Sequence, residues 1–450
     1  MSGPRRPRPG GQGRPARVDP ARRTAYDLLY AVATQDAYAN LALPALLTER
    51  ELTGRDAAFA TELAFGTLRQ RGLLDAVLSR CVTRPYDEVD GSVRDLLRLG
   101  AFQLLEMRVP PHAAVGETVS LARDVSGDGV SRFVNAVLRK VSARTREEWL
   151  TEITPADGDV VARLAVTTSH PAWIVSALRD SLGGDDAELE ELLTIGNVPP
   201  HVTLVARPGR STPDDLLVHP GTGPGRWSPF AVTLRSGPPS AVPEVRSGDA
   251  GVQDEGSQLV ALALAAAPLG DDRPETAWLD LCSGPGGKAA LLAALAAERG
   301  ATLTAVEISA HRARLVRQAL EGGPGRHEVV EADGTDPRWA TGTYDRVLVD
   351  APCTGLGVLR RRPEARWRRT PADVGALARL QRDLLRSALA AVRPGGVVGY
   401  ATCSPHVAET DLVVDDVLRG RDDVEVLDVW TMVPPLRADL PRRHGDTGPA

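Results

Sequence analysis

From residue 276 onward, the sequence alternates between short apolar runs, which predict strands, and longer amphipathic stretches, which predict helices. The expected strands lie near 277–282, 302–307, 327–331, 345–350, 396–402 and 424–429. The expected helices lie near 286–298, 309–320, 371–392 and 408–419. Strands that alternate with helices form parallel sheets whose two faces are both covered. We therefore expect an α/β domain with a doubly wound parallel sheet over residues 251–450.

The sequence before this region predicts domains of a different kind. Residues 1–18 carry five arginines and no acid among prolines and glycines, which predicts a disordered basic arm, either a solvated tail or an RNA contact. Residues 19–146 keep a helical periodicity without strand patterns and predict an all-helical domain. Residues 147–250 combine helical segments with short strands between prolines and glycines, which predicts a small α+β linker domain. The chain is therefore expected to be a multidomain protein.

Composition argues against several classes of protein. No stretch approaches the roughly 20 apolar residues of a membrane helix, so no membrane contact is expected. Four cysteines in 450 residues form neither a disulfide framework nor paired metal-ligand spacings, so we expect a cytoplasmic protein without a metal. The net charge of −6 conceals a basic block at 360–369. We expect these arginines to form a phosphate track for RNA at the rim of the site.

A strand, a glycine-rich turn and a helix start follow one another at 277–288. The glycines let the backbone approach a ligand, and Asp280 precedes the turn. Glu307 and Asp333 end the next two strands, where carboxylates can meet a ribose diol and an adenine amino group. Each carboxylate alone is as consistent with a helix cap as with a ligand. Together, three acids at successive strand ends favour S-adenosylmethionine, which has a ribose and an adenine but no phosphate.

Two thiols follow two of the predicted strands. Asp350 and Cys353 come after one apolar run, and Cys403 follows another. Ligands bind at the carboxyl ends of strands in open α/β sheets, so we expect both thiols to line one pocket. A single cysteine can equally be a small buried hydrophobe, and Cys81 and Cys282 are interpreted in that way.

These motifs give the chain a resemblance to a known family. Residues 350–353 read Asp-Ala-Pro-Cys and residues 401–404 read Ala-Thr-Cys-Ser, and the pair resembles the RNA cytosine-5 methyltransferases. The Val-Asn-x-x-Leu-Arg pattern at 134–139 and the Gln-Asp-Glu-x-Ser pattern at 253–257 are similar to the Sun/Fmu (RsmB-like) type, which methylates 16S ribosomal RNA. The resemblance covers nearly the whole chain.

The resemblance implies a domain order and a reaction. It identifies residues 19–146 as a NusB-like RNA-binding domain, 147–250 as a small intermediate domain and 251–450 as a Rossmann-like class I methyltransferase domain. It implies S-adenosyl-L-methionine as the cofactor and RNA, above all 16S ribosomal RNA, as the partner. The implied reaction is methyl transfer to C5 of a cytosine by a monomeric enzyme.

The resemblance also implies roles for individual residues. Cys403 would be the nucleophile that attacks C6, Asp350 would meet the base near N3, and Cys353 would act in the release of the product. The implied cofactor-binding residues are Asp280, Cys282, Ser283, Gly284, Pro285, Gly286, Gly287, Lys288, Glu307, Arg312, Asp333 and Asp350.

The sequence departs from the family pattern in several places, among them Glu307 and the end of the chain. Glu307 stands where aspartate is frequent, which lengthens the reach to a ribose, and residues 442–450 stand where the family usually continues into an apolar strand. Two alternatives remain. The same chemistry could act on transfer RNA or on a protein, or a non-catalytic RNA-binding or assembly protein could use the helical domain. The intact acids and thiols argue against the second alternative.

Overall fold

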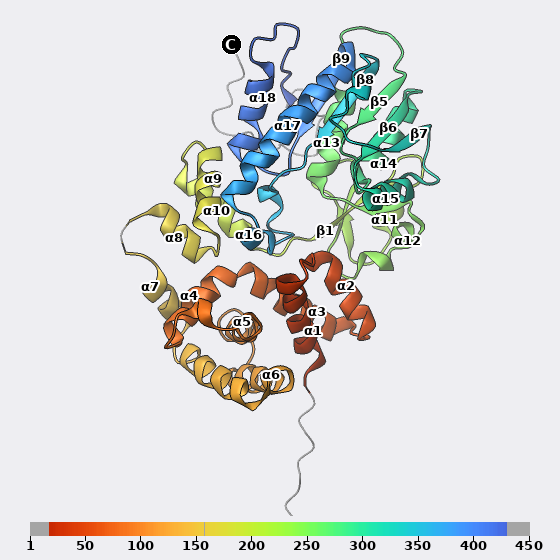
Figure 1. Cartoon of the computed structure of the whole chain (residues 1–450). Coiled ribbons are helices and arrows are strands. Elements are labelled where there is room, and N and C mark those ends of the chain that lie inside the picture. Colours follow the sequence, from red (N-terminus) through yellow and green to blue (C-terminus); the bar gives the residue numbers. More distant parts are fainter. Residues whose placement is uncertain (1–17, 157, 430–450) are drawn as a thin grey trace, which may run out of the picture. The chain divides into compact units, whose positions relative to one another are not determined.

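The computed structural model describes residues 18–156 and 158–429 (Figure 1). Within these ranges the chain forms two compact units. The first unit comprises the residues up to 198 together with the segment 358–368, and the second comprises the other described residues. The expectations for the basic arm and for the end of the chain concern residues outside the described ranges.

The first unit is built from helices. α1 (Pro20–Thr34) begins after Asp19, because the Asp19 carboxylate accepts a hydrogen bond from the Arg22 amide at 2.8 Å and proline suits the first helical position. The other helices are α2 (Ala39–Glu49), α3 (Gly54–Arg69), α4 (Arg71–Cys81), α5 (Gly91–Leu105), α6 (Pro111–Val141), α7 (Arg146–Ile153), α8 (Val160–Thr167), α9 (Ala172–Ser181), α10 (Asp186–Ile195) and α16 (Ala365–Arg368). The apolar faces of α1 to α7 meet in one core. The prediction of an all-helical domain is confirmed.

Arg366 anchors the segment 358–368 in the first unit. Its side chain has no exposed surface, and its guanidinium group faces a set of oxygen acceptors. These acceptors, at 2.8–3.3 Å, are the carbonyl oxygens of Arg69, Ser169 and Gly196 and Oδ1 of Asn197. Burial, together with the charge of Arg69, lowers the pKa of Arg366 to about 9. The segment is therefore an integral part of this unit.

The predicted phosphate track at 360–369 does not hold for two of its arginines. Arg366 is buried, and Arg368 donates to the carbonyl oxygens of Val32 and Ala37, both at 2.7 Å. Carbonyl oxygens and phosphate oxygens are both good acceptors for a guanidinium group. A run of basic residues in a sequence does not tell which of the two kinds of acceptor will bind it.

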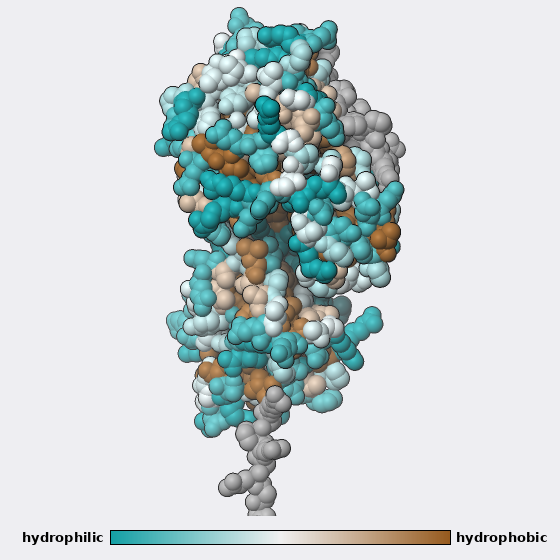
Figure 2. All heavy atoms as spheres, turned by 90° about the vertical axis from the view of Figure 1, so that its right-hand side faces the viewer, coloured by the Kyte–Doolittle hydropathy of each residue, from teal (hydrophilic) through white to brown (hydrophobic). Residues whose placement is uncertain are grey.

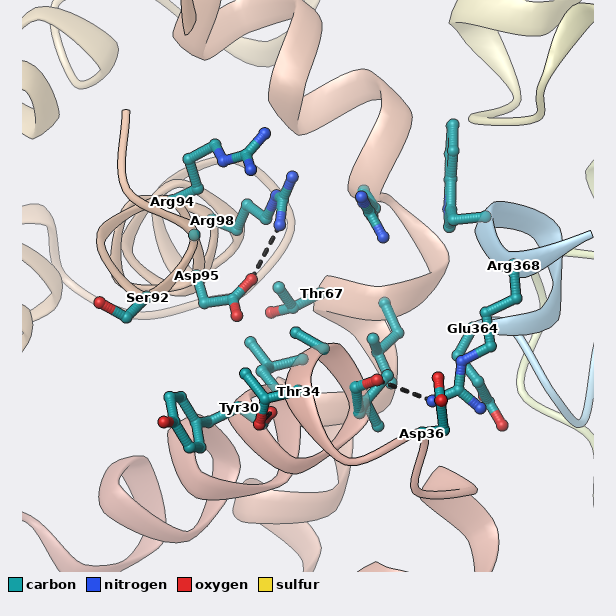
Figure 3. A pocket seen from close by; sticks show the side chains of 17 residues that line it. Tyr30, Thr34, Asp36, Thr67, Ser92, Arg94, Asp95, Arg98, Glu364 and Arg368 are labelled. Carbon is teal, nitrogen blue, oxygen red and sulfur yellow. Dashed lines mark hydrogen bonds and ion pairs between the residues drawn. The ribbon is translucent and has the colours of Figure 1, made fainter. Parts of the chain in front are cut away.

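A cavity of about 380 Å³ lies in the first unit (Figure 3). Arg98 in its wall donates to Asp95 at 2.8 Å and to both oxygens of Asp75 at 2.7 Å. The guanidinium group of Arg71 lies over the ring of Trp367, 5.3 Å from its centroid. The charge of Arg98 is paired with two carboxylates of the protein itself, and we assign no ligand to the cavity.

The second unit begins with a small antiparallel sheet in the order β2-β3-β1-β4. Its elements are β1 (Val202–Ala206), α11 (Pro213–Leu217), β2 (Thr222–Pro224), β3 (Ala231–Leu234), α12 (Pro243–Ser247) and β4 (Ala250–Val252). The helices that precede it belong to the first unit, where α8 contacts α4. The structure thus divides the predicted linker domain 147–250 near residue 198, because its helices and its strands pack on different partners.

The larger sheet has five parallel strands in the order β7-β6-β5-β8-β9 (Figure 1). Its elements are α13 (Glu255–Ala266), β5 (Ala277–Asp280), α14 (Gly287–Glu298), β6 (Thr302–Glu307), α15 (Ala310–Leu320), β7 (His327–Glu331), β8 (Tyr344–Asp350), α17 (Pro371–Ala391), β9 (Val392–Ala401) and α18 (Asp411–Leu418). Trp278 and Leu348 pack against α13 and α14, whereas Leu279 and Val347 pack against α17. Both faces are covered, which confirms the predicted α/β domain.

The prediction of a sixth strand at 424–429 is wrong. Residues 424–428 have no regular structure, and Val426 and Val429 leave 69% and 47% of their surface exposed. Among the described residues, the ladder partner of β9 is β8. An alternating apolar pattern shows which side chains a strand would bury, but a strand forms only where a neighbour supplies backbone groups for pairing.

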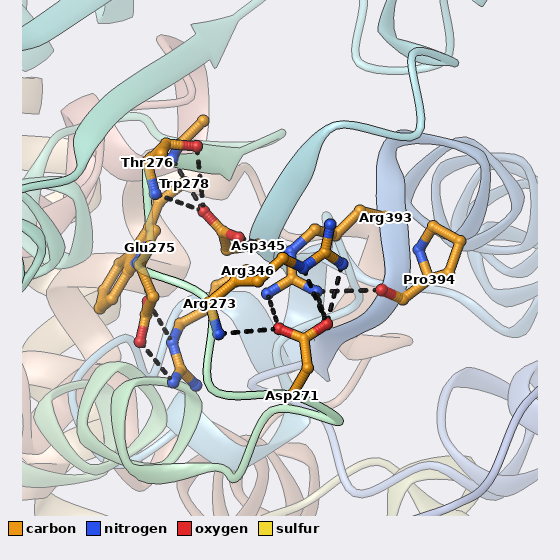
Figure 4. A network of polar contacts seen from close by, with 10 residues as sticks. Asp271, Arg273, Glu275, Thr276, Trp278, Asp345, Arg346, Arg393 and Pro394 are labelled. Carbon is orange, nitrogen blue, oxygen red and sulfur yellow. Dashed lines mark hydrogen bonds and ion pairs between the residues drawn. The ribbon is translucent and has the colours of Figure 1, made fainter.

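Charged residues join the amino ends of the parallel strands (Figure 4). Asp345, near the start of β8, accepts hydrogen bonds from the Thr276 amide and from Nε of Arg393, each at 2.6 Å. Arg346 donates to both carboxylate oxygens of Glu275 at 2.9 Å. These buried pairs lie at the end of the sheet opposite to the predicted site, so they support the fold without taking part in the chemistry.

On the face shown in Figure 2, hydrophilic side chains cover most of the surface and hydrophobic ones lie in small groups. The large apolar residues with the most exposure, among them Leu41, Val218 and Ile308, belong to different elements. No helix within 18–156 or 158–429 is long and apolar enough to cross a membrane.

Candidate active site

The carboxyl ends of the parallel strands bring the predicted site residues to one edge of the sheet. In the sheet order β7, β6, β5, β8 and β9, the residues at or just beyond these ends are Asp333, Glu307, Asp280, Asp350 and Cys403. The loop after β8 adds Cys353. Neighbouring ends in a parallel sheet are close in space, so the strand order turns five separated sequence positions into one row of polar groups.

Asp350 ends β8 and is held by a lysine from the helix that follows the glycine-rich turn. Lys288 Nζ donates to Oδ2 of Asp350 at 2.7 Å and to Oγ of Ser257 at 2.9 Å. The lysine side chain is 14% exposed and the aspartate side chain 30% exposed, so this ion pair is partly shielded from water. The pair fixes the direction in which the Asp350 carboxylate points.

The glycine-rich turn needs glycine for two different reasons. Gly286 precedes α14 with φ at 108°, a conformation that other residues rarely adopt. At Gly284, a Cβ atom would lie 2.2 Å from Oε2 of Glu307. The turn therefore runs directly against the end of β6, where the backbone and the carboxylate are in contact.

Glu307 is bound on several sides. The residue is 3% exposed, and its carboxylate accepts hydrogen bonds from the Gly284 amide at 3.1 Å and the Ser309 amide at 2.9 Å. Arg312 forms an ion pair with Oε2 at 3.4 Å and donates to the Gly284 carbonyl oxygen at 2.5 Å. Glu307 and Arg312 thus hold the glycine-rich turn in place beside α15.

Asp280 is completely buried at the end of β5, and one of its oxygens has no protein partner. Oδ1 accepts a hydrogen bond from the Cys282 amide at 3.2 Å, whereas Oδ2 is buried without a hydrogen bond. Burial raises the pKa of Asp280 to about 7, and the charge of Asp350 contributes in the same direction. A buried carboxylate oxygen beside a glycine-rich turn is a ready acceptor for a cationic amine of a ligand.

Cys282 lies in the same turn but is unsuited to nucleophilic chemistry. Burial raises the pKa of its thiol, and the carboxylates of Asp280 and Asp350 raise it further. Ser283 is also committed to the fold, because its amide and its hydroxyl both donate to the Val306 carbonyl oxygen at 2.9 Å. These two side chains shape the turn.

Asp333 is the most exposed of the carboxylates in this row. Its Oδ1 accepts hydrogen bonds from the amide and the hydroxyl of Thr335, both at 2.8 Å. Its backbone oxygen accepts from Nε1 of the buried Trp339 at 2.8 Å. The tryptophan therefore fixes the backbone of this loop, while the carboxylate lies at the surface beyond β7.

The two thiols lie together, as the sequence predicts. The Sγ atoms of Cys353 and Cys403 are 3.3 Å apart, a hydrogen-bond distance for thiols and well beyond the roughly 2 Å of a disulfide. Cys403 is exposed and Cys353 is half-buried. The hydrogen bond with Cys403 and burial both raise the pKa of Cys353. Cys353 is thus set up to hold a proton, and Cys403 is the more accessible sulfur.

Three residues of this site escape the sequence reasoning. Ser257 lies in a motif that carries the family resemblance, but its contact with Lys288 has no signal in the sequence. Gln381 in α17 is far from either cysteine motif in the chain. Glu409 follows the second cysteine motif but belongs to no motif of its own. Both are buried beneath the thiol loops. Within the described ranges, no group of histidine, cysteine or acidic residues has the arrangement of a metal site.

Comparison with known proteins finds family models that match both parts of the chain. A family model described as 16S rRNA methyltransferase RsmB/F matches residues 267–437, and a NusB family model matches residues 19–143. A protein of Mycobacterium tuberculosis that is named as a methyltransferase is 52% identical over 438 residues, which cover 95% of this chain and 94% of that protein.

Two further relatives carry a more specific name. Ribosomal RNA small subunit methyltransferase B of Pseudomonas putida is 32% identical over 93% of this chain and 92% of its own length. The protein of the same name from Escherichia coli is 31% identical, with 87% and 89% covered. The crystal structure of PH0851 has the same fold, with a TM-score of 0.73, 19% identity and 90% of each chain covered.

Proposed function

Because this chain belongs to the RsmB/F family of 16S rRNA methyltransferases, we propose that it transfers a methyl group from S-adenosylmethionine to C5 of a cytosine in 16S ribosomal RNA. The observation that carries the proposal is the pair of thiols 3.3 Å apart at the ends of β8 and β9, next to Asp350. Methylation of a cytosine ring carbon requires covalent activation, and a thiol pair beside an acid is suited to it.

The chemistry begins at Cys403. C5 of cytosine is a poor nucleophile and must be activated. The Cys403 thiolate therefore adds to C6 and forms a C6–Sγ bond, while N3 takes up a proton. The carboxyl group of Asp350 meets the base near N3. The ring then has an enamine-like C5. S-adenosylmethionine, when bound, supplies an electrophilic methyl group to this carbon.

Release of the product reverses the attachment. Water takes the C5 proton, and cleavage of the C6–Sγ bond restores the C5–C6 double bond and returns the electron pair to sulfur. N3 gives up the proton that it took during the addition. Cys353 lies 3.3 Å from the departing sulfur and retains its proton, so it is placed to hydrogen-bond to the thiolate as it leaves. Cys403 then returns to its starting state.

The row of carboxylates fits the cofactor. The unpartnered Oδ2 of Asp280 would bind the ammonium group of the methionine portion. Glu307 at the end of β6 would meet the ribose, and Asp333 beyond β7 would meet the adenine. The glycine-rich turn and Arg312 hold Glu307 in place. The remaining implied residues, Pro285, Gly287 and Lys288, continue the turn into α14.

A direct test combines labelled cofactor with two cysteine variants. Small-subunit ribosomal RNA that lacks the modification is incubated with labelled S-adenosylmethionine, and the labelled nucleotide is mapped. Cys403→Ala should abolish methyl transfer and any covalent adduct with RNA. Cys353→Ala should still transfer the methyl group but accumulate an adduct that survives denaturation.

The same two variants can also contradict the proposal. An adduct that persists in Cys403→Ala and is lost in Cys353→Ala would reverse the two roles. Full methyl transfer by both variants would show that the reaction does not use the thiols, and no methyl transfer by the parent protein would favour a non-catalytic RNA-binding protein. Label on transfer RNA instead of ribosomal RNA would favour the alternative substrate. Calorimetric affinity for S-adenosylmethionine serves as the control, because neither thiol belongs to the glycine-rich turn.

A further inference from the structure

We propose that Glu409 is a positioning residue that holds the two thiol loops together and thereby sets the distance between Cys353 and Cys403. The inference rests on the function proposed above and adds a residue that neither cysteine motif contains. Glu409 ends the short helix η5 (Val407–Glu409), and its carboxylate has no exposed surface. A carboxylate buried so deeply is beyond the reach of RNA, so it can act only through the groups that it binds.

The hydrogen bonds of Glu409 lead to the Cys353 loop. Its Oε1 accepts from the Thr354 amide at 2.8 Å and from Nε2 of Gln381 at 3.2 Å, and its Oε2 accepts from the Thr354 hydroxyl. Gln381 also donates to the Pro352 carbonyl oxygen at 2.8 Å. The residues on both sides of Cys353 are therefore fixed by Glu409 and its partner in α17.

The same network reaches the Cys403 loop. The Thr354 hydroxyl lies 3.0 Å from the hydroxyl of Ser404, the residue after Cys403. The Gly357 amide donates to the Cys403 carbonyl oxygen at 2.9 Å. At Gly357, a Cβ atom would lie 2.8 Å from that oxygen, so the two loops are in direct backbone contact. Each cysteine is thus followed by a residue that belongs to one shared, buried network.

A carboxylate is needed at this position because three donors converge on it. The Thr354 amide, the Thr354 hydroxyl and the Gln381 amide group all point their hydrogens at Glu409. Burying a carboxylate is costly unless such donors satisfy it. A glutamine of the same shape would keep one acceptor oxygen but turn an N–H group toward a donor. Glu409→Gln should therefore loosen the loops while changing the volume very little.

The test measures thiol proximity without RNA. Phenylarsine oxide bridges two nearby thiols by forming two As–S bonds and releasing one water. The parent protein should bind one equivalent through Cys353 and Cys403, as read by intact mass, and Cys353→Ala should bind none. Glu409→Gln should weaken the bridge and lower kcat, each by about tenfold or more, the scale of a lost hydrogen bond to a buried charged group. Its affinity for S-adenosylmethionine and its KM for RNA should change by less than about twofold.

A matched variant separates positioning from general stability. Asp345 is also a buried carboxylate that accepts backbone hydrogen bonds, but it lies at the amino end of β8. Asp345→Asn should lower Tm yet leave the arsenical bridge and kcat unchanged. Should Glu409→Gln fail to fold, Thr354→Val removes the hydroxyl that links Glu409 to Ser404 and should change both readouts in the same direction.

The outcomes are distinct. An unchanged arsenical bridge in Glu409→Gln, or equal losses of kcat in the Glu409 and Asp345 variants at equal loss of Tm, would overturn the positioning role. If the parent protein fails to methylate ribosomal RNA while its arsenical bridge still depends on Glu409, the proposed function falls and the positioning of the thiols stands.

Discussion

Asp280 should make the binding of S-adenosylmethionine depend on pH in a range where ordinary aspartates do not titrate. Its carboxyl group is fully buried, Oδ2 has no hydrogen-bond donor, and burial together with the charge of Asp350 raises its pKa to about 7. A large fraction of the protein without cofactor is therefore protonated at this position near neutral pH. An aspartate in water, with a pKa of about 4, would be fully ionised there.

The sign and size of the effect follow from this pKa. A ligand ammonium group binds the ionised carboxylate, so affinity should rise with pH. With a pKa of about 7, the ionised fraction grows from about 3% at pH 5.5 to about one half at pH 7.0, so the affinity should rise roughly 15-fold. Binding at pH 5.5 should release close to one proton. Without cofactor, the folded state binds the Asp280 proton more tightly than the unfolded state does. Protonation of Asp280 therefore stabilises the fold at low pH, and this contribution to the free energy of unfolding is lost as pH rises from about 4 to about 7.

Calorimetry can distinguish the titration of Asp280 from the titration of the ligand's own amine. Titrations at several pH values, in pairs of buffers with different ionisation enthalpies, give both the affinity and the number of protons released. Asp280→Asn should bind more weakly than the parent at pH 7.0 and should lose the Asp280-dependent slope, leaving only the titration of the ligand's own amine. Parallel pH profiles for the parent and Asp280→Asn would refute the assignment of Asp280 to the cofactor.

Two further predictions concern the fold. Arg366→Leu should lower the free energy of unfolding by about 3 kcal/mol or more, because it leaves buried acceptors on Arg69, Ser169, Gly196 and Asn197 without a donor. Denaturant unfolding measures this change. A loss below about 1 kcal/mol would show that water replaces the guanidinium group. Asp345→Asn should flatten the loss of stability on acidification. Burial acts to raise the pKa of Asp345, but hydrogen bonds from the Ala277 amide, Arg393 and the Thr276 amide outweigh burial and hold the pKa below its ordinary value. The ionised carboxylate therefore stabilises the folded state at pH values above the ordinary aspartate pKa. This contribution to stability disappears as pH falls through the lowered pKa. Identical acid limbs for the parent and Asp345→Asn in urea-unfolding midpoints against pH would contradict this reasoning.

Local patterns in the sequence determined the elements of the fold. The apolar run that ends at Val349 identifies a strand buried on both faces, and Asp19 with Pro20 identifies a helix start, because strand burial and helix capping are decided by residues adjacent in the chain. The incorrect strand at 424–429 marks the limit of this reasoning. Its side chains are mostly apolar, but strand formation also depends on a neighbouring edge, which adjacent residues do not specify.

The sequence by itself also determined which chemical groups the site contains, since Asp350, Cys353 and Cys403 stand in recognisable motifs after strands. Only the tertiary structure decided how these groups meet. The order of the strands places β8 beside β9 and so brings two sulfurs, fifty residues apart in the chain, to 3.3 Å. Burial raises the pKa of Asp280 and commits Arg366 to carbonyl oxygens of the helical unit, and the same packing places Glu409 beneath both thiol loops. Distance, burial and partner choice arise from contacts between remote segments, which is why residue types and spacings alone could not supply them.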